Sequence, residues 1–115
     1  MKAKANMPGD DATPPIACTL PPERMEGRIE HVNEALAPAY VRAEAHGDGL
    51  TIAFDGTDET LAAVASFVAE ESVCCSFATY QIAVAPPHEE TRLRITGPEG
   101  TTEMFREGLL PLLES

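Results

Sequence analysis

The chain has 115 residues, 43% of them hydrophobic, no Trp, and a formal net charge of -11. This size predicts one small domain. The acidity argues against a nucleic-acid partner, because the chain would repel a phosphate backbone. No apolar run approaches the roughly 20 residues of a membrane-spanning helix, so we expect no membrane partner either.

Residues 1–15 combine three prolines with Lys, Asn, Asp and Gly and contain almost no large apolar side chain. Such a segment cannot offset the entropy of being ordered, so we expect a flexible tail over 1–15 and a single α+β domain over 16–115. The basic start lacks the apolar stretch of about 7–15 residues that a signal peptide needs. Three cysteines also make a poor secreted disulfide framework, and we therefore expect a cytoplasmic protein.

Residues 21–36 are predicted to form the first helix, opened by two prolines. Their large apolar side chains recur with a 4-3-4 spacing, which places them on one helical face. These side chains are Met25, Ile29, Val32 and Leu36.

Residues 39–46 and 50–54 alternate in polarity on either side of a Gly-rich turn, which predicts a β-hairpin. Residues 55–58 then supply turn and N-cap chemistry for a second helix that runs towards Ser72. Its expected buried face consists of Leu61, Val64, Ala65 and Val68.

The second half repeats this pattern, with strands predicted over 77–84 and 92–96 and a last helix beginning after Gly100. The face of that helix is expected to hold Phe105, Leu109 and Leu112, and Pro111 should kink it or end it early. Corresponding strands and helices lie about 43 or 44 residues apart, consistent with an internal ββα duplication. The sequence thus predicts an N-terminal helix and two strand-strand-helix units, forming a four-stranded, mainly antiparallel sheet with helices on one face. The strand order does not follow from the sequence.

Two adjacent thiols, Cys74 and Cys75, stand where the second helix is expected to end, within one helical turn or so of Glu70 and Glu71. A disulfide between neighbouring residues closes a small strained ring, so such a pair tends to stay reduced or readily reducible. Two thiolates at this spacing can reach one soft metal ion. A helix C-terminus and nearby carboxylates disfavour thiolates, so a metal would supply the missing positive charge and its affinity should rise with pH.

The third thiol, Cys18, lies just before the first helix, where free N–H groups favour a thiolate. If that helix crosses the end of the second one, Cys18 completes a three-sulfur site with Cys74 and Cys75. No CxxC pair suited to structural zinc is present. Three histidines are possible fourth ligands but are better interpreted as surface residues: His31, His46 and His88.

A structural interpretation of the cysteines stays open. Cysteine is among the most buried residue types, and Cys75 falls on the same helical stripe as Leu61 and Val68. Two consecutive residues at a helix end cannot both point into one core, however, and this favours a functional role for the pair.

The residues around Cys74 and Cys75 form part of a longer sequence pattern. The chain contains Glu71-x-x-Cys74-Cys75-x-Phe77, then an apolar strand, then Leu93-x-Ile95-x-Gly97-Pro98-Glu99-Gly100 and a closing apolar helix. This pattern resembles a group of small bacterial proteins with an E-x-x-C-C-x-F motif, in which Cys-Thr-Leu precedes the first helix as Cys18-Thr19-Leu20 does here. The resemblance implies a thiol-based association with heavy metals at Cys18, Cys74 and Cys75.

The leading hypothesis is therefore a soft metal-ion binding protein for sequestration, delivery or sensing. Hg(II) is favoured, then Cu(I), and As(III), Zn(II), Cd(II) and Pb(II) are further candidates. A second copy of the chain or an acceptor protein would be its partner. Two alternatives stay open. One is a ligand-free dimerising interaction module with structural cysteines. The other, less expected, is a thiol-based enzyme that exchanges disulfides or cleaves a metal–carbon bond with Glu70 or Glu71 as proton donor.

Overall fold

The computed structural model describes residues 22–114, with side chains from Glu26 onward except that of Cys74. The predicted tail, Cys18 and the side chain of Met25 lie outside this described part.

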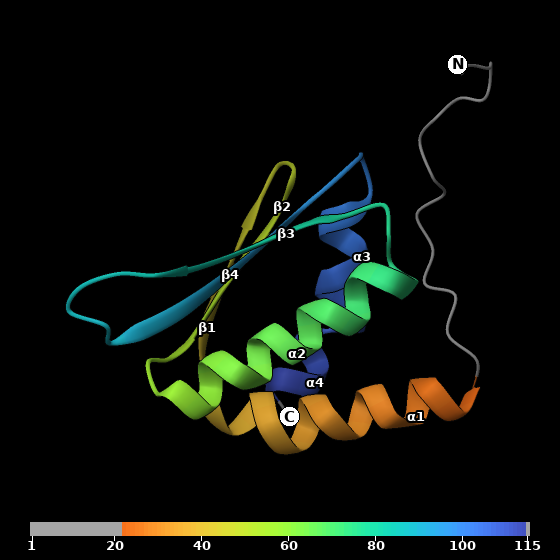
Figure 1. The fold of residues 1–115 in the computed structure, drawn as a ribbon. Coiled ribbons are helices and arrows are strands. Elements are labelled where there is room, and N and C mark those ends of the chain that lie inside the picture. The colour runs from red at the N-terminus through yellow and green to blue at the C-terminus, as the bar shows by residue number, and fades with distance from the viewer. Residues whose placement is uncertain (1–21, 115) are drawn as a thin grey trace, which may run out of the picture.

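The described chain follows the predicted order of a helix and two strand-strand-helix units, which confirms an α+β fold (Figure 1). Helix α1 runs into a π-helical turn, η1, and a 3-10 turn, η2. The last helix is divided in two. The elements are α1 (Pro22–His31), η1 (Val32–Leu36), η2 (Ala37–Ala39), β1 (Tyr40–His46), β2 (Gly49–Asp55), α2 (Asp58–Cys74), β3 (Thr79–Val84), β4 (Glu90–Thr96), α3 (Thr101–Gly108) and α4 (Leu110–Glu114).

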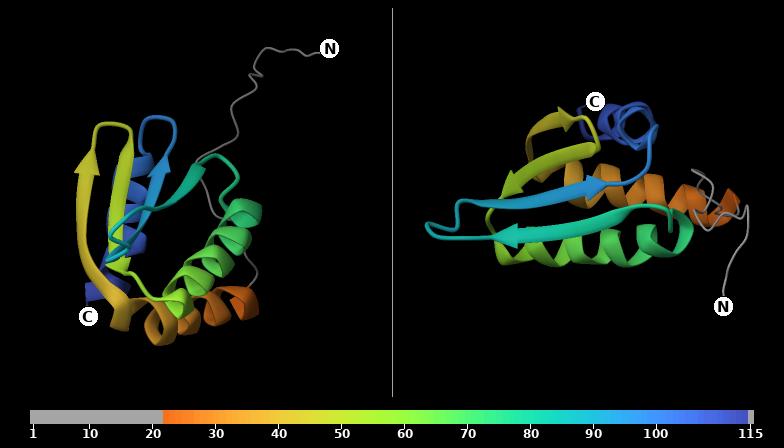
Figure 2. Two further views of the ribbon diagram at one scale, coloured as in Figure 1. Left: turned by 60° about the vertical axis from the view of Figure 1, so that its left-hand side comes forward. Right: turned by 90° about the horizontal axis from the view of Figure 1, so that it is seen from above.

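The four strands form one sheet in the order β1-β2-β4-β3, and every neighbouring pair is antiparallel. The two hairpins therefore join through their second strands, with β1 and β3 at the edges (Figure 2). At the centre, Leu50 pairs with Ile95 and Ile52 pairs with Leu93. Residues 43 positions apart, such as Leu50 and Leu93, therefore take equivalent places on either side of the Thr51–Arg94 pair. Two similar ββα units would pair in this way.

The core lies between the sheet and the helices. Side chains at alternate positions of the central strands point into it, while Arg92 and Arg94 of β4 are exposed on the opposite face. Helix α2 packs beside β3 and β4, and α3 beside β1 and β2 (Figure 2). The central members of the core are Leu50, Ile52, Phe54, Val64, Phe67, Leu93, Ile95, Phe105 and Leu109.

The predicted face of α1 is partly wrong. Val32 and Leu36 are buried, but Ile29 is 37% exposed. Arg28 takes the buried position instead, since it lies one helical turn before Val32, and its guanidinium carbon lies 5.9 Å from the centre of the Phe67 ring. A hydrophobic pattern cannot anticipate a buried arginine, because its burial depends on an acidic partner elsewhere in the chain.

The buried stripe of α2 also differs from the predicted one. The N-cap is Thr57, as expected from the turn residues, and its side chain accepts a hydrogen bond from the Thr60 amide. The stripe that faces the core, however, holds Val64, Phe67 and Glu71. Of the predicted members, Val64 is buried and the half-buried Val68 packs against the core, whereas Leu61 is only half-buried and Ala65 is exposed.

The last helix ends early, as the proline predicts. Helix α3 stops at Gly108, and α4 begins at Leu110, directly before Pro111. The break rotates the following turn, so Leu113 is buried where Leu112 was expected. Across residues 22–114, no helix has both the length and the apolar character needed to span a membrane.

Candidate functional site

Cys75 occupies the corner between α2 and β3. Its amide donates to the Glu71 carbonyl oxygen at 2.6 Å, which closes the last turn of the helix, and its backbone (φ -117, ψ 64) then leaves the helical conformation. The Cys75 side chain is 0% exposed and belongs to the core. Phe77, two residues further along, is also buried and lies 6.1 Å from Phe105 between ring centres. Of the specified positions of the E-x-x-C-C-x-F motif, the three whose side chains are described, Glu71, Cys75 and Phe77, are therefore buried.

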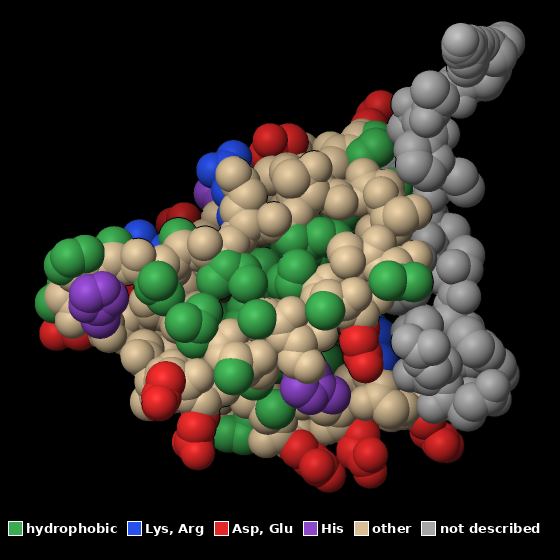
Figure 3. Space-filling model, viewed as in Figure 1, with side chains coloured by type: hydrophobic (Ala, Val, Ile, Leu, Met, Phe, Trp, Pro, Cys, Tyr) green, Lys and Arg blue, Asp and Glu red, His purple; other side chains and the backbone are tan. Residues whose placement is uncertain are grey.

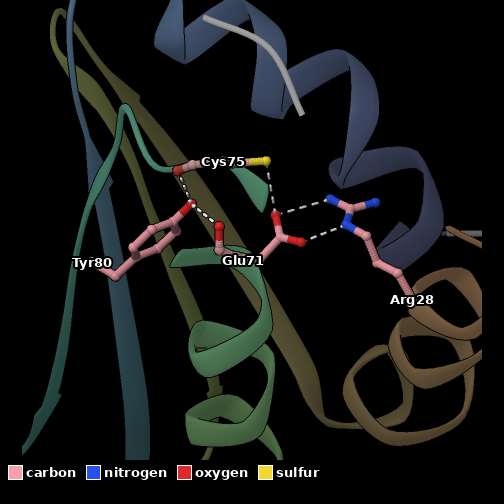
Figure 4. A network of polar contacts seen from close by, with 4 residues as sticks. All are labelled: Arg28, Glu71, Cys75 and Tyr80. Carbon is pink, nitrogen blue, oxygen red and sulfur yellow. Dashed lines mark hydrogen bonds and ion pairs between the residues drawn. The ribbon is translucent and has the colours of Figure 1, made fainter. Parts of the chain in front are cut away.

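Glu71 is the buried acid of the motif, and it forms an ion pair with Arg28 of α1 (Figure 4). Arg28 Nε donates to Glu71 Oε2 at 2.6 Å, and Arg28 Nη2 donates to Oε1 at 3.2 Å. Glu71 is 0% exposed and Arg28 only 9%. A carboxylate can be buried this deeply because a two-pronged guanidinium contact compensates its charge.

The same carboxylate lies against the cysteine sulfur. Cys75 Sγ is 3.7 Å from Glu71 Oε1, within hydrogen-bonding distance for sulfur (Figure 4). Cys75 is disulfide-bonded in this structure, so its sulfur carries no proton here. Reduction would create a thiol that can donate to Glu71, and a thiolate would place a second negative charge beside that carboxylate.

Tyr80 of β3 fixes the end of α2 to the sheet. Its hydroxyl donates to the carbonyl oxygen of Cys75 at 3.0 Å and lies 3.4 Å from that of Glu71. Both carbonyls lie at the C-terminal end of the helix, and each also accepts a backbone amide, that of Cys75 for Glu71 and that of Ala78 for Cys75. The Tyr80 ring also packs edge-on against Phe105, with centres 6.5 Å apart. The backbone at Cys75 is thus held from both the helix and the strand.

The structure describes only part of the predicted three-sulfur site. Cys75 is placed as above, Cys74 is the final residue of α2, and Cys18 lies outside the described residues. Among the side chains that the structure describes, no group of three His, Cys, Asp or Glu residues could hold a metal ion. The approach of Cys18 to Cys74 and Cys75 therefore stays a prediction.

The three histidines lie in separate places. His31 Nε2 is 3.2 Å from the Ala63 carbonyl oxygen, and His46 Nε2 is 2.8 Å from Thr51 Oγ1. Both rings are half-buried, whereas His88 is exposed in the loop between β3 and β4 with a φ of 65. The expectation of a surface residue holds fully for His88 alone. The other two imidazoles have partners of their own.

Sequence reasoning missed Arg28 and Tyr80. A weak signal existed for Arg28, because it precedes Val32 and Leu36 at the spacing of one helical face. Nothing local could pair it with Glu71, which is 43 residues away. The sequence pattern places Tyr80 in a strand and says nothing of its hydrogen bond to the helix end, which depends on how the chain turns at Cys75.

The arrangement can hold a buried sulfur next to a charge-compensated carboxylate. Neither glutamate is well placed to act as the proton donor of an enzyme, because Glu70 is exposed and Glu71 already accepts hydrogen bonds from Arg28.

The site is inferred from the chain's own residues. Comparisons with models of protein families, with curated proteins and with solved structures find no match to the chain.

Proposed function

We propose that the protein binds a soft metal ion through the thiolates of Cys74 and Cys75, with Cys18 as a third ligand. Its role would be sequestration, delivery or sensing of a heavy metal. The observation that carries the proposal is the wholly buried Cys75 sulfur beside the Arg28–Glu71 ion pair. Hg(II) is the favoured ion and Cu(I) the second, because both prefer thiolate ligands.

The ion pair supports a chemical role for this corner of the fold. A buried ion pair adds little stability compared with apolar residues of the same size, so stability alone is a weak reason for it. Here Arg28 offsets the charge of Glu71, which would otherwise oppose a thiolate 3.7 Å away. The guanidinium thereby lowers the electrostatic cost of forming a metal-binding sulfur in the core.

Charge balance orders the candidate ions. A buried site favours complexes without net charge, because an uncompensated charge is costly in a medium of low polarity. Hg(II) with two thiolates is neutral, and As(III) with three thiolates is neutral. Cu(I) with two thiolates, and Zn(II), Cd(II) or Pb(II) with three, retain a negative charge. The burial of Cys75 and Glu71 therefore favours Hg(II) when only Cys74 and Cys75 bind the ion, and As(III) when Cys18 binds it as a third thiolate.

The disulfide of Cys75 makes the proposed binding depend on redox state. A sulfur in a disulfide is not a thiolate ligand, so the chain must be reduced before Cys75 can bind a metal. We expect the oxidised protein to bind none of these ions tightly.

The test is an anaerobic titration of the fully reduced chain with Hg(II), Cu(I), Zn(II) and arsenite, followed by native mass spectrometry. One Hg(II) per chain is expected, lost in Cys74→Ser and Cys75→Ser and weakened in Cys18→Ser. A variant in which His31, His46 and His88 are all replaced by Ala serves as control and should bind like the wild type. Binding that survives in both Cys74→Ser and Cys75→Ser would refute the proposal.

A further inference from the structure

The disulfide of Cys75 has two candidate partners. The sequence holds three cysteines, so the bonded residue is either Cys18 or the adjacent Cys74. A disulfide normally joins residues whose Cα atoms are about 4.4–6.8 Å apart. The Cα atoms of consecutive residues are at most about 3.8 Å apart, which is too close for an ordinary disulfide. The distance between Cα atoms therefore favours Cys18.

Helix α1 brings the first part of the chain towards Cys75. The start of α1 and the end of α2 lie at the same end of the molecule (Figure 1, Figure 2). Arg28 of α1 donates to Glu71 at 2.6 Å, and the same carboxylate lies 3.7 Å from Cys75 Sγ. Helix α1 begins at Pro22, about 9 Å of helix before Arg28. Cys18, outside the described residues, precedes Pro22 by four positions, which span at most about 14 Å, so its sulfur can reach that of Cys75.

We propose that Cys75 forms its disulfide with Cys18, and that this bond is a redox switch of the metal site, opened by a dithiol reductant. The bond would tie the segment before α1 to the corner between α2 and β3. In the oxidised chain, two of the three proposed ligands are bonded to each other and cannot bind an ion as thiolates. The switch rests on the proposed function, whereas the pairing of the two cysteines does not.

Opening the bond is a thiol–disulfide exchange. A thiolate of the reductant attacks one sulfur, which forms a mixed disulfide and releases the other sulfur as a thiolate. The second thiol of the reductant then breaks the mixed disulfide. The reductant leaves as a disulfide, and its two protons pass to the sulfurs of Cys18 and Cys75. The Cys75 side chain is 0% exposed, so the first attack is expected at the other sulfur of the bond.

Carboxylates surround this end of the helices and decide the choice of reductant. Figure 3 shows acidic side chains along the edge of the molecule where α1 runs. Glu26 and Glu30 of α1 and Glu70 of α2 are exposed near the Arg28–Glu71 ion pair in the sequence. A reductant with an additional negative charge is repelled by such a surface. Dithiothreitol, a dithiol with no other charged group, is therefore the probe.

Tryptic mapping of the oxidised chain, with free thiols blocked by iodoacetamide under denaturing conditions, tests the pairing. Trypsin places Cys18 in the peptide 5–24, and Cys74 and Cys75 together in the peptide 43–92. We expect the two peptides to be linked, with the blocking group on Cys74, and to separate after treatment with dithiothreitol. Unlinked peptides, or a link that fragmentation assigns to Cys74, would overturn the proposal.

Cys74→Ser is the matched control for Cys18→Ser. The linked peptides should persist in Cys74→Ser and be absent from Cys18→Ser. Dithiothreitol should lower the melting temperature of the wild type and of Cys74→Ser by about 10 °C or more, because the bond closes a long loop in the unfolded chain. It should leave Cys18→Ser unchanged. An equal shift in Cys18→Ser would contradict the pairing.

Native mass spectrometry with Hg(II) tests the switch. The oxidised chain and the reduced chain, freed of dithiothreitol by anaerobic gel filtration, receive the same amount of Hg(II). We expect one bound ion per reduced chain and a loss of most of this binding in the oxidised chain. Equal binding by both forms would overturn the switch. If the peptides are linked but neither form binds Hg(II), the proposed function fails, and the switch with it, while the pairing stands.

Discussion

At the scale of single residues, the ion pair between Arg28 and Glu71 differs from the surface ion pairs. Its side chains are 10% and 0% exposed, whereas those of Arg42 and Glu90, across β1 and β4, are 54% and 24% exposed. Removing one partner of a buried pair leaves an uncompensated charge in the core. An exposed pair is already screened by water and contributes little.

Arg28→Met should therefore lower the free energy of unfolding by about 3–5 kcal/mol, because Glu71 would stay buried without its cation. Arg42→Met, the matched control, should cost at most about 1 kcal/mol. Urea unfolding followed by circular dichroism measures both. Combining Arg28→Met with Glu71→Leu should recover much of the loss. Equal effects of Arg28→Met and Arg42→Met would contradict this account of the pair.

Tyr80 is predicted to stabilise the corner at Cys75 through its hydroxyl. Tyr80→Phe keeps the ring against Phe105 but leaves the helix-end carbonyls without this donor, so it should cost about 1 kcal/mol or somewhat more. The other tyrosine is the control, because the Tyr40 hydroxyl binds the exposed Glu114 carboxylate and Tyr40→Phe should cost less. Thermal unfolding of the two variants under identical conditions compares them. A larger loss in Tyr40→Phe would show that the hydroxyl of Tyr80 is not important at the corner.

At the scale of elements, the start of α2 is held by a small network around Asp55. The Thr60 hydroxyl donates to Asp55 Oδ1 at 2.6 Å, and the Thr57 amide and hydroxyl lie 3.3 and 3.1 Å from the same oxygen. The hydrogen bond from Thr60, followed by those from Thr57, lowers the pKa of Asp55 below its ordinary value of 3.8. The network therefore stabilises the fold more strongly when Asp55 is ionised than when it is neutral.

The pH dependence follows from that sign. A carboxyl whose pKa is lowered by folding contributes stability above its ordinary pKa and loses it as the pH falls through the folded-state value. Asp55→Asn should be less stable than the wild type near neutral pH, and the difference should shrink as the pH falls below 3.8. Melting temperatures of both proteins across the acid range test this. A difference that is constant with pH would exclude a role for the charge of Asp55.

The order of the elements could be predicted because each has a local signal. The alternating strands, the Gly-rich turn before Gly49, the cap at Thr57 and the break before Pro111 are all encoded within a few residues. The strand order could not be predicted, because it depends on which hairpin edges meet in three dimensions.

The faces of the helices were predicted less well, for a physical reason. The spacing of apolar residues assigns each of them to the core. In this fold the core contains Arg28 and Glu71, whereas Ile29 and Ala65 are exposed. An ion pair can replace apolar residues in the core only when both of its partners are buried together. The spacing of residues within one helix does not show which distant residue is the partner. For the candidate site, the sequence therefore identified Glu71 and Cys75 but not their contacts with Arg28 and Tyr80.

At the scale of the whole molecule, the net charge of -11 opposes the folded state, because like charges are brought closer together on folding. Salt screens this repulsion. The melting temperature should therefore rise as NaCl is increased from about 20 to about 200 mM, because the Debye length shortens from roughly 20 to below 10 Å. Thermal unfolding at several NaCl concentrations measures it. A melting temperature that falls with added salt would show that attraction between opposite charges outweighs the repulsion.

The proposed metal site uses thiolates, with Cys75 among them, in the buried corner between α2 and β3. X-ray absorption at the mercury edge, on the reduced chain loaded with one Hg(II), identifies the ligand atoms of the bound ion. We expect a first shell of two or three sulfur atoms with no nitrogen or oxygen, and a loss of sulfur ligands in Cys75→Ser. A first shell of nitrogen or oxygen, or an unchanged sulfur shell in Cys75→Ser, would contradict it.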